Sequence, residues 1–254
     1  MISLKKNMLI AVGAFFLYTP LVGAQEGPVT TSLLSLLGDG GMLMLPIGFC
    51  SLILVMFSFE RVMSLRRNRI IPRPFVRRIL EQLKSGELDK REAYRLCKEN
   101  KSPIAEVFTV ALRKWGRPST EVEKAVVDAG ERLGNRLRKY LRLFNGISTI
   151  TPLLGLLGTV IGMIRAFNAI VVVGAMGKPE LLAAGIGQAL ITTAAGLTVA
   201  IPALIAYLYF TSRVDQILIR VDEHGQEIVR SISAEGLNRV KRKQVRLASQ
   251  QQAA

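Results

Sequence analysis

The sequence is poor in the residues that build metal sites, disulfide frameworks and hydrolytic triads. Its 254 residues include two cysteines, one histidine and one tryptophan. Two cysteines, Cys50 and Cys97, are too few for a disulfide scaffold, and with the single His224 they are too few for a His/Cys metal cluster. No GxSxG motif occurs, and His224 lies in the charged segment DEHGQE, which disfavours a Ser/His/Asp hydrolase. We therefore expect neither an enzyme nor a bound metal or cofactor.

Acidic residues are scarce relative to basic ones, with 19 Asp and Glu against 34 Lys and Arg. The excess is uneven along the chain. Residues 25–60 contain no Lys or Arg, whereas residues 61–145 contain 22 against 10 acidic residues and residues 211–254 contain 8 against 5. This asymmetry around apolar segments is typical of the positive-inside rule of membrane proteins. Aromatic residues are few and do not interleave with the basic ones, so we expect no nucleic-acid binding.

The apolar residues are gathered into long blocks. Half of the residues are hydrophobic and the mean hydropathy is +0.32 although 21% are charged. Residues 1–24 combine Lys5 and Lys6, an apolar stretch, Pro20 and a small-residue site ending at Ala24, which is the pattern of a signal peptide. An uncleaved additional span is the alternative. Either reading places the following segment, residues 25–39, outside the membrane.

Three further blocks reach the length of a membrane span. Residues 40–59 and 143–164 are uncharged, and residues 181–212 form a third uncharged block. A helix over the 32 residues of the third block would measure about 48 Å at ~1.5 Å per residue, so it should extend beyond a ~30 Å hydrocarbon core. We predict an all-α protein with three transmembrane helices and long helical extensions into the cytoplasm. The predicted segments after the leader are residues 40–60 (first span), 61–142 (cytoplasmic helical region), 143–173 (second span), 174–180 (periplasmic loop), 181–212 (third span) and 213–254 (cytoplasmic helix and tail).

The last helix of the cytoplasmic region has a recognisable start. Thr120 with Glu123 forms a capping box after Pro118, and apolar residues follow at helical spacing as far as Phe144. No helix breaker precedes Pro152. We therefore expect one long helix from the cytoplasm into the second span.

Small and hydroxylated residues form a stripe along each of the last two spans. The stripes are Ser148, Pro152, Gly155, Thr159, Gly162 and Ala166, and Gly185, Ala189, Thr193, Gly196, Ala200 and Ala203. Such stripes let helices pack closely in lipid, and packing alone is one interpretation of them. Membrane threonines also commonly bond only their own helix backbone.

The two spans lack a group that could carry a proton. Neither contains Asp, Glu, His or Lys, and the one nearby charge is Arg165. Hydroxyls orient water but do not ionise near neutral pH, so an ion path along this chain needs a carboxylate from another chain. Arg165 either reaches the outer headgroups or contacts an acid, such as a partner's or Glu180.

Two motifs resemble the MotA/TolQ/ExbB proton channel family, most closely ExbB and TolQ. They are TPLLGLLGTVIGMI at residues 151–164 and ALITTAAGL at residues 189–197, followed by Ala200-Ile201-Pro202. Glu60-Arg61 at the end of the first span also fits, and the resemblance covers residues 35–235. The GLLGT segment lacks the GK[ST] of a phosphate-binding loop.

The resemblance implies a multi-pass subunit of the bacterial inner membrane that forms a ring, expected to be a pentamer, within membrane lipid. The ring would surround an ExbD/TolR-like single-span partner that supplies an Asp, and would drive a TonB/TolA-like energy transducer in biopolymer transport. It also implies roles for single residues. Those expected to line the proton path are Thr159, Thr193, Thr192 and Gln188, and those expected in helix packing are Gly155, Gly158, Gly162, Gly196, Ala200 and Pro202.

The chain departs from the family pattern at two positions. Many relatives have Glu where this chain has Gln188, and Arg165 within the second span is not a family feature. A non-conducting membrane scaffold is therefore an alternative function. A flagellar stator subunit fits the three-span plan less well, and a small-solute channel lacks a charged selectivity residue.

Overall fold

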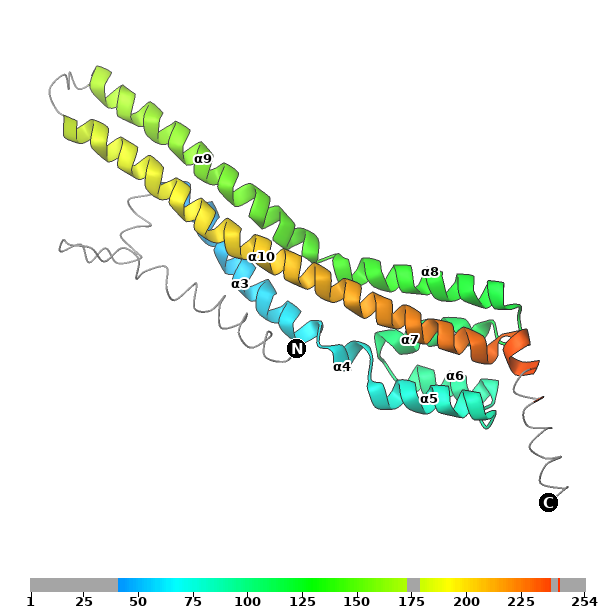
Figure 1. Cartoon of the computed structure of the whole chain (residues 1–254). Coiled ribbons are helices and arrows are strands. Elements are labelled where there is room, and N and C mark those ends of the chain that lie inside the picture. Colours follow the sequence, from blue (N-terminus) through cyan, green and yellow to red (C-terminus); the bar gives the residue numbers. More distant parts are fainter. Residues whose placement is uncertain (1–40, 173–178, 239–241, 243–254) are drawn as a thin grey trace. The chain divides into compact units, whose positions relative to one another are not determined.

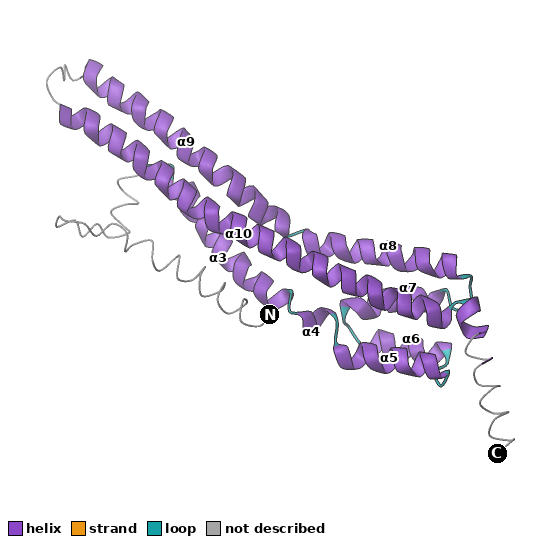
Figure 2. Cartoon of the chain, viewed as in Figure 1, coloured by secondary structure: helices purple, strands orange, loops and turns teal. Residues whose placement is uncertain are grey.

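The computed structural model describes residues 41–172, 179–238 and 242, and all the elements in this part of the chain are helices (Figures 1 and 2). This confirms the predicted all-α class. The predicted leader, residues 1–24, and the periplasmic segment 25–39 lie outside the described residues, as does most of the loop 174–180. The helices are α3 Met44–Ser64, α4 Arg67–Ile70, α5 Arg73–Ser85, α6 Lys90–Glu99, α7 Pro103–Arg113, α8 Ser119–Arg138, α9 Leu141–Val172 and α10 Pro179–Ile232.

Three stretches are long and apolar enough to cross a membrane, and they lie within Met44–Ser64, Ser119–Asn168 and Leu182–Ile232. Only 17% of the most apolar stretch of α3 is buried within the chain. The exposed side chains are large and apolar, for example Leu45 and Phe49. Because water would solvate such a surface poorly, these helices belong in lipid or against other protein. The protein is a membrane protein.

The chain forms two compact units. In the described residues, the first unit consists of the start of α3 to Leu54, α9 from Phe144 onward and α10 to Ile205. The second unit consists of the rest of α3, α4 to α8 with residues up to 143, and α10 from Ala206 onward.

The second unit has an apolar core drawn from most of its helices. Side chains that are at most 2% exposed come from α5 to α8 and from α10, and they include Ile79, Phe108, Leu112, Leu133, Ile217 and Ile228. Two backbone hydrogen bonds join the α7–α8 loop to the end of α10: Gly116 N donates to Ile232 O at 3.0 Å, and Ala234 N donates to Arg117 O at 2.9 Å. Gly116 has φ 75°, a left-handed conformation that favours glycine.

This shared core draws on distant parts of the chain. The residues that follow α3 and the last part of α10 belong to the same unit, and Lys84 Nζ lies 3.1 Å from Glu227 Oε2. The segment that follows α3 and the last part of α10 therefore pack in one compact unit. Between them along the chain, α9 and α10 form a helical hairpin.

Two predictions at the α8–α9 region are wrong. The helix is not continuous into the second span, because Lys139 and Tyr140 form a turn between α8 and α9. The capping box is also absent, because α8 begins at Ser119 after Pro118 without a side-chain cap. Instead, Ser119 N donates to Glu235 Oε2 at 3.1 Å. A carboxylate from beyond α10 thus satisfies one of the helix's first amides, and a capping box is not needed there.

Candidate functional site

The backbones of α9 and α10 are in contact at glycines. A Cβ added at Gly196 would lie 2.6 Å from the carbonyl oxygen of Thr151, and one added at Gly155 would lie 3.1 Å from the Cα of Thr193. Neither neighbour is a flexible side-chain end. Any larger residue at Gly196 would therefore force the two helices apart.

The contact continues along both helices. A Cβ at Gly162 would lie 2.8 Å from the Cβ of Ala189, and one at Gly185 would lie 2.7 Å from the Cβ of Ala166. Gly158 is buried against the side chain of Thr192. The contact therefore extends from Thr151 to Ala166 on α9.

The contact face differs in part from the stripe expected from sequence. Thr151 is fully buried and Gly158 is buried, whereas Ser148, Pro152 and Thr159 are half-buried. The face follows Thr151, Gly155, Gly158, Gly162 and Ala166, and four of these five residues are Gly or Ala, so little side chain separates the two helices. Ala200 and Pro202, farther along α10, are also buried.

The threonine hydroxyls of these helices donate mainly to their own backbone. Thr159 Oγ1 donates to Leu156 O at 2.6 Å, and Thr192 Oγ1 donates to Gln188 O at 2.8 Å. Thr193 differs, because its Oγ1 donates across the hairpin to Gly155 O at 3.0 Å. Its hydroxyl therefore holds the two spans in register, while the oxygen can still accept hydrogen bonds.

A small cavity of about 110 Å³, lined mostly by apolar surface, lies beside this contact. It is large enough to hold water. Its walls come from the turn just before α3, from α9 and from α10. The lining residues are Gly41, Met42, Leu43, Gly158, Ile161, Gly162, Arg165, Gln188 and Thr192.

Gly41 lies close to both Gln188 and Arg165, the two residues at which the chain departs from the expected pattern. A Cβ at Gly41 would lie 2.7 Å from Gln188 Nε2 and 3.5 Å from Arg165 Nη1. Gly41 also has φ 71°, and its carbonyl accepts a hydrogen bond from Met44 N at 3.0 Å. Glycine is thus required both by the backbone conformation and by the close approach.

The structure therefore divides the path residues expected from sequence. Gln188 and Thr192 line the cavity together with Arg165, whereas Thr159 and Thr193 are not among its lining residues. Gly41 is not among the site residues expected from the sequence. The Gly40-Gly41 pair just before an apolar block was the signal that a tight turn begins there.

Arg61, near the end of α3, is a second residue whose burial is not expected from the sequence. It is 4% exposed. Its Nη2 donates to Glu60 Oε1 at 2.9 Å, and its Cζ lies 4.2 Å from the centre of the Tyr140 ring. A guanidinium over an aromatic face is attracted to the ring quadrupole. Arg61 thus fastens the end of α3 to the turn between α8 and α9.

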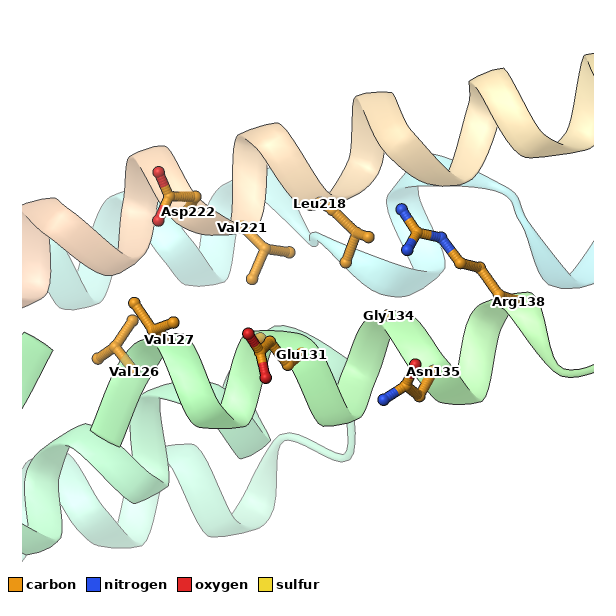
Figure 3. A pocket seen from close by; sticks show the side chains of 10 residues that line it. Val126, Val127, Glu131, Gly134, Asn135, Arg138, Leu218, Val221 and Asp222 are labelled. Carbon is orange, nitrogen blue, oxygen red and sulfur yellow. The ribbon is translucent and has the colours of Figure 1, made fainter. Parts of the chain in front are cut away.

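A groove of about 440 Å³ lies between α8 and α10 in the second unit. Figure 3 shows the side chains that line it. Val126 and Leu218 contribute apolar surface, while Glu131 and Asp222 contribute charge. At one end Arg138, which also lines the groove, pairs with Asp215 at 2.7 Å. Gly134 lies under Leu218, since an added Cβ would be 3.1 Å from Leu218 Cδ1.

No group of three or more His, Cys, Asp or Glu side chains that could hold a metal ion occurs in the described residues. Burial raises the pKa of the Cys97 thiol to about 12, which keeps it protonated and a poor ligand at neutral pH.

The chain is similar to proteins of one family. The sequence profile of the MotA/TolQ/ExbB proton channel family matches residues 99–223, from the end of α6 into α10. A Synechocystis sp. protein named as biopolymer transport protein ExbB-like 1 is 34% identical over 68% of this chain and 68% of its own length. A biopolymer transport protein ExbB homolog of Methanothermobacter thermautotrophicus is 29% identical over 87% of this chain and 75% of its own. The Tol-Pal system protein TolQ of Pseudomonas aeruginosa is 30% identical over 55% of this chain and 66% of its own.

Proposed function

Because the chain belongs to the MotA/TolQ/ExbB proton channel family, we propose that it is the ring-forming subunit of a proton-driven membrane complex. The complex would couple the proton gradient to biopolymer transport or to work on the cell envelope. The observation that carries this proposal is the α9–α10 hairpin, which is closed by backbone contacts and carries hydroxyls but no carboxylate between residues 143 and 172 or 181 and 205.

Because these spans contain no carboxylate, a partner protein would supply the group that carries the proton. An ExbD/TolR-like single-span protein would place an Asp against the ring, and protonation of that Asp would change its preferred position among the ring helices. A TonB/TolA-like transducer would receive the resulting motion. Five copies of this chain would form the ring.

Four residues are proposed to line the proton path. Thr193 donates to Gly155 O, so its oxygen is held in a fixed place where it can accept a hydrogen bond from water or from the partner's Asp. Thr159 is half-buried and would face the same path. Thr192 and Gln188 would hold water in the small cavity.

Arg165 is proposed as a charge partner for an acid of the complex. It shares the cavity with Gln188, and both approach Gly41. A glutamate at position 188 would pair with this guanidinium, whereas the neutral amide leaves the positive charge available to another carboxylate.

Residues 61–142 and 213–254 are proposed to lie in the cytoplasm, and the spans in the bacterial inner membrane. The support is the excess of Lys and Arg in residues 61–145 and 211–254, which the positive-inside rule places on the cytoplasmic side.

Proton flux into proteoliposomes tests the proposal. The full chain is reconstituted with and without the acidic single-span partner, under an imposed pH gradient and potential. We expect flux only with the partner, lost on replacing the partner's Asp by Asn and on Thr193→Val. Thr193→Ser is the matched control, because it keeps the hydroxyl. Flux retained in Thr193→Val would reduce Thr193 to a packing residue.

A non-conducting scaffold is the second candidate function. Two observations favour it: the Thr193 hydroxyl is engaged in helix packing, and position 188 is neutral. Absence of flux in an assembled complex that includes the transducer would support the scaffold. Gln188→Glu and Arg165→Leu would then be the first variants to test for recovery of conduction.

A further inference from the structure

An unusual run of arginines follows the membrane part of α3. Seven of the eighteen residues 61–78 are arginine, and none is acidic. They are Arg61, Arg66, Arg67, Arg69, Arg73, Arg77 and Arg78. The positive-inside rule accepts Lys and Arg alike, and lysines occur later in the same unit, from Lys84 onward. The rule therefore does not explain why this run contains arginine alone.

Four members of the run are exposed and make no ion pair within the described part of the chain: Arg66, Arg69, Arg73 and Arg78. Two others are already engaged. Arg61 is buried against Tyr140, and Arg77 Nε pairs with Glu81 at 2.7 Å. The four exposed guanidinium groups have their donors available for an external anion.

The backbone that carries these arginines is fixed. Ile70, the last residue of α4, and Ile71 after it are 2% and 1% exposed. Val76, Ile79 and Leu80 of α5 are also buried. Apolar side chains thus anchor α4 and α5, which follow α3 along the chain (Figure 1), into the second unit, while the four arginines are exposed. A preorganised cation set loses less entropy on binding than a mobile tail.

We propose that Arg66, Arg69, Arg73 and Arg78 form a binding surface for the phosphate groups of anionic lipids in the leaflet at the Ser64 end of α3. Arg66 is two residues beyond the last residue of that helix, which places it at headgroup level if α3 spans the membrane. Guanidinium groups bind phosphate oxygens in bidentate fashion, which ammonium groups do not. Basic clusters directly beyond a span typically recognise anionic lipid.

The alternative occupants fit less well. A nucleic acid would require aromatic side chains for stacking, and residues 61–78 contain Phe75 as their one aromatic residue. An acidic protein would not need the surface to begin directly at the end of an apolar helix. The lipid proposal rests on α3 spanning the membrane but not on proton conduction, so loss of one does not imply loss of the other.

Lipid retention measured by native mass spectrometry tests this proposal. The full-length chain in detergent is offered equal amounts of phosphatidylglycerol and phosphatidylcholine. We expect the wild-type chain to retain the anionic lipid preferentially. The variant R66Q/R69Q/R73Q/R78Q should lose that preference, by ~5-fold for each arginine at low salt. The variant with the same four positions changed to Lys should keep only part of it.

The matched control is the variant K90Q/R91Q/K98Q/K101Q, which removes the same charge from α6 and from Lys101, two residues after that helix. All four side chains are exposed. This control should leave the preference unchanged, and equal losses in both variants would refute the proposal. Absence of a preference in the wild-type chain would also refute it. Millimolar inorganic phosphate should not displace the lipid, and complete displacement would instead indicate a site for free phosphate. If the fourfold variant fails to fold, R66Q/R69Q, which lies outside α5, gives the same comparison.

Discussion

At the scale of single residues, Gly196 is a position where the addition of one methyl group should have a large effect. A methyl group there would lie 2.6 Å from the Thr151 carbonyl oxygen, and backbone cannot move aside cheaply. We expect Gly196→Ala to destabilise the chain by about 1–3 kcal/mol through overpacking. Thermal unfolding in detergent measures the effect.

Gly187→Ala is the matched control for this substitution. Gly187 also lies on α10, and an added Cβ there meets no heavy atom within 4 Å. Because alanine favours helix, this control should be neutral or stabilising by up to ~1 kcal/mol. Equal destabilisation by both variants would mean that the contact at Gly196 is not tight.

Cys97 gives a second prediction at this scale. It is 2% exposed, and burial raises the pKa of its thiol from 9.0 to about 12. In a Cys50→Ser background, Cys97 should react with iodoacetamide very slowly at pH 8, because only about one thiol in ten thousand is ionised. Its reaction should speed up with rising pH, and unfolding in SDS should make it fast. Prompt labelling of the folded chain at pH 8 would contradict this.

The raised pKa of the Cys97 thiol also determines how the stability of the chain changes with pH. Since the pKa is higher in the folded than in the unfolded state, ionisation of Cys97 favours unfolding. Its contribution to stability is complete below pH 9 and is lost as the pH rises towards 12.

Sequence patterns identify individual residues well where the chemistry is local. The lack of acids in the last two spans and the small residues Gly155, Gly162 and Gly196 are legible from the sequence, and the structure places those glycines at the helix contact. Burial of Arg61 is not legible, because it depends on Tyr140, which is far away in sequence. The meeting of Gln188 and Arg165 at Gly41 is hidden for the same reason.

At the scale of elements, the contact between Arg61 and Tyr140 joins α3 to the turn that separates α8 from α9. The attraction requires the ring and not the hydroxyl. Tyr140→Phe should therefore preserve stability, whereas Tyr140→Ala should cost about 1–2 kcal/mol, since it also strips cover from a buried guanidinium. Denaturant unfolding compares the two. Similar losses in both variants would assign the effect to the hydroxyl instead.

The sequence predicts which segments are helical better than it predicts where each helix begins and ends. Apolar periodicity marks the spans and the extension of α10, because burial or lipid contact imposes it on the sequence. The end at Arg138 and the start at Ser119 depend on long-range partners. Glu235 supplies the acceptor for the Ser119 amide, and no local pattern around Thr120 and Glu123 reveals that.

At the scale of the whole molecule, the shared core of the second unit makes a topological prediction. Residues in the α5–α6 loop and at the end of α10 should be on one side of the membrane, because both regions belong to that core. In a chain free of other cysteines, Glu87→Cys and Asn238→Cys should both resist an impermeant maleimide in intact spheroplasts. Both should react after lysis. Labelling of only one of them in intact cells would contradict the shared core.

The closed α9–α10 hairpin also determines how activity should depend on the number of chains per vesicle. The cavity of about 110 Å³ is far too small for a continuous file of water across a ~30 Å hydrocarbon core. A single chain with its partner should be impermeable, and conduction should arise at surfaces between chains. When less protein is reconstituted per vesicle, the fraction of vesicles that conduct protons should fall much more steeply than the mean number of chains per vesicle. Counting labelled chains in single vesicles measures this, and a proportional decline down to one chain would mean that each hairpin conducts by itself.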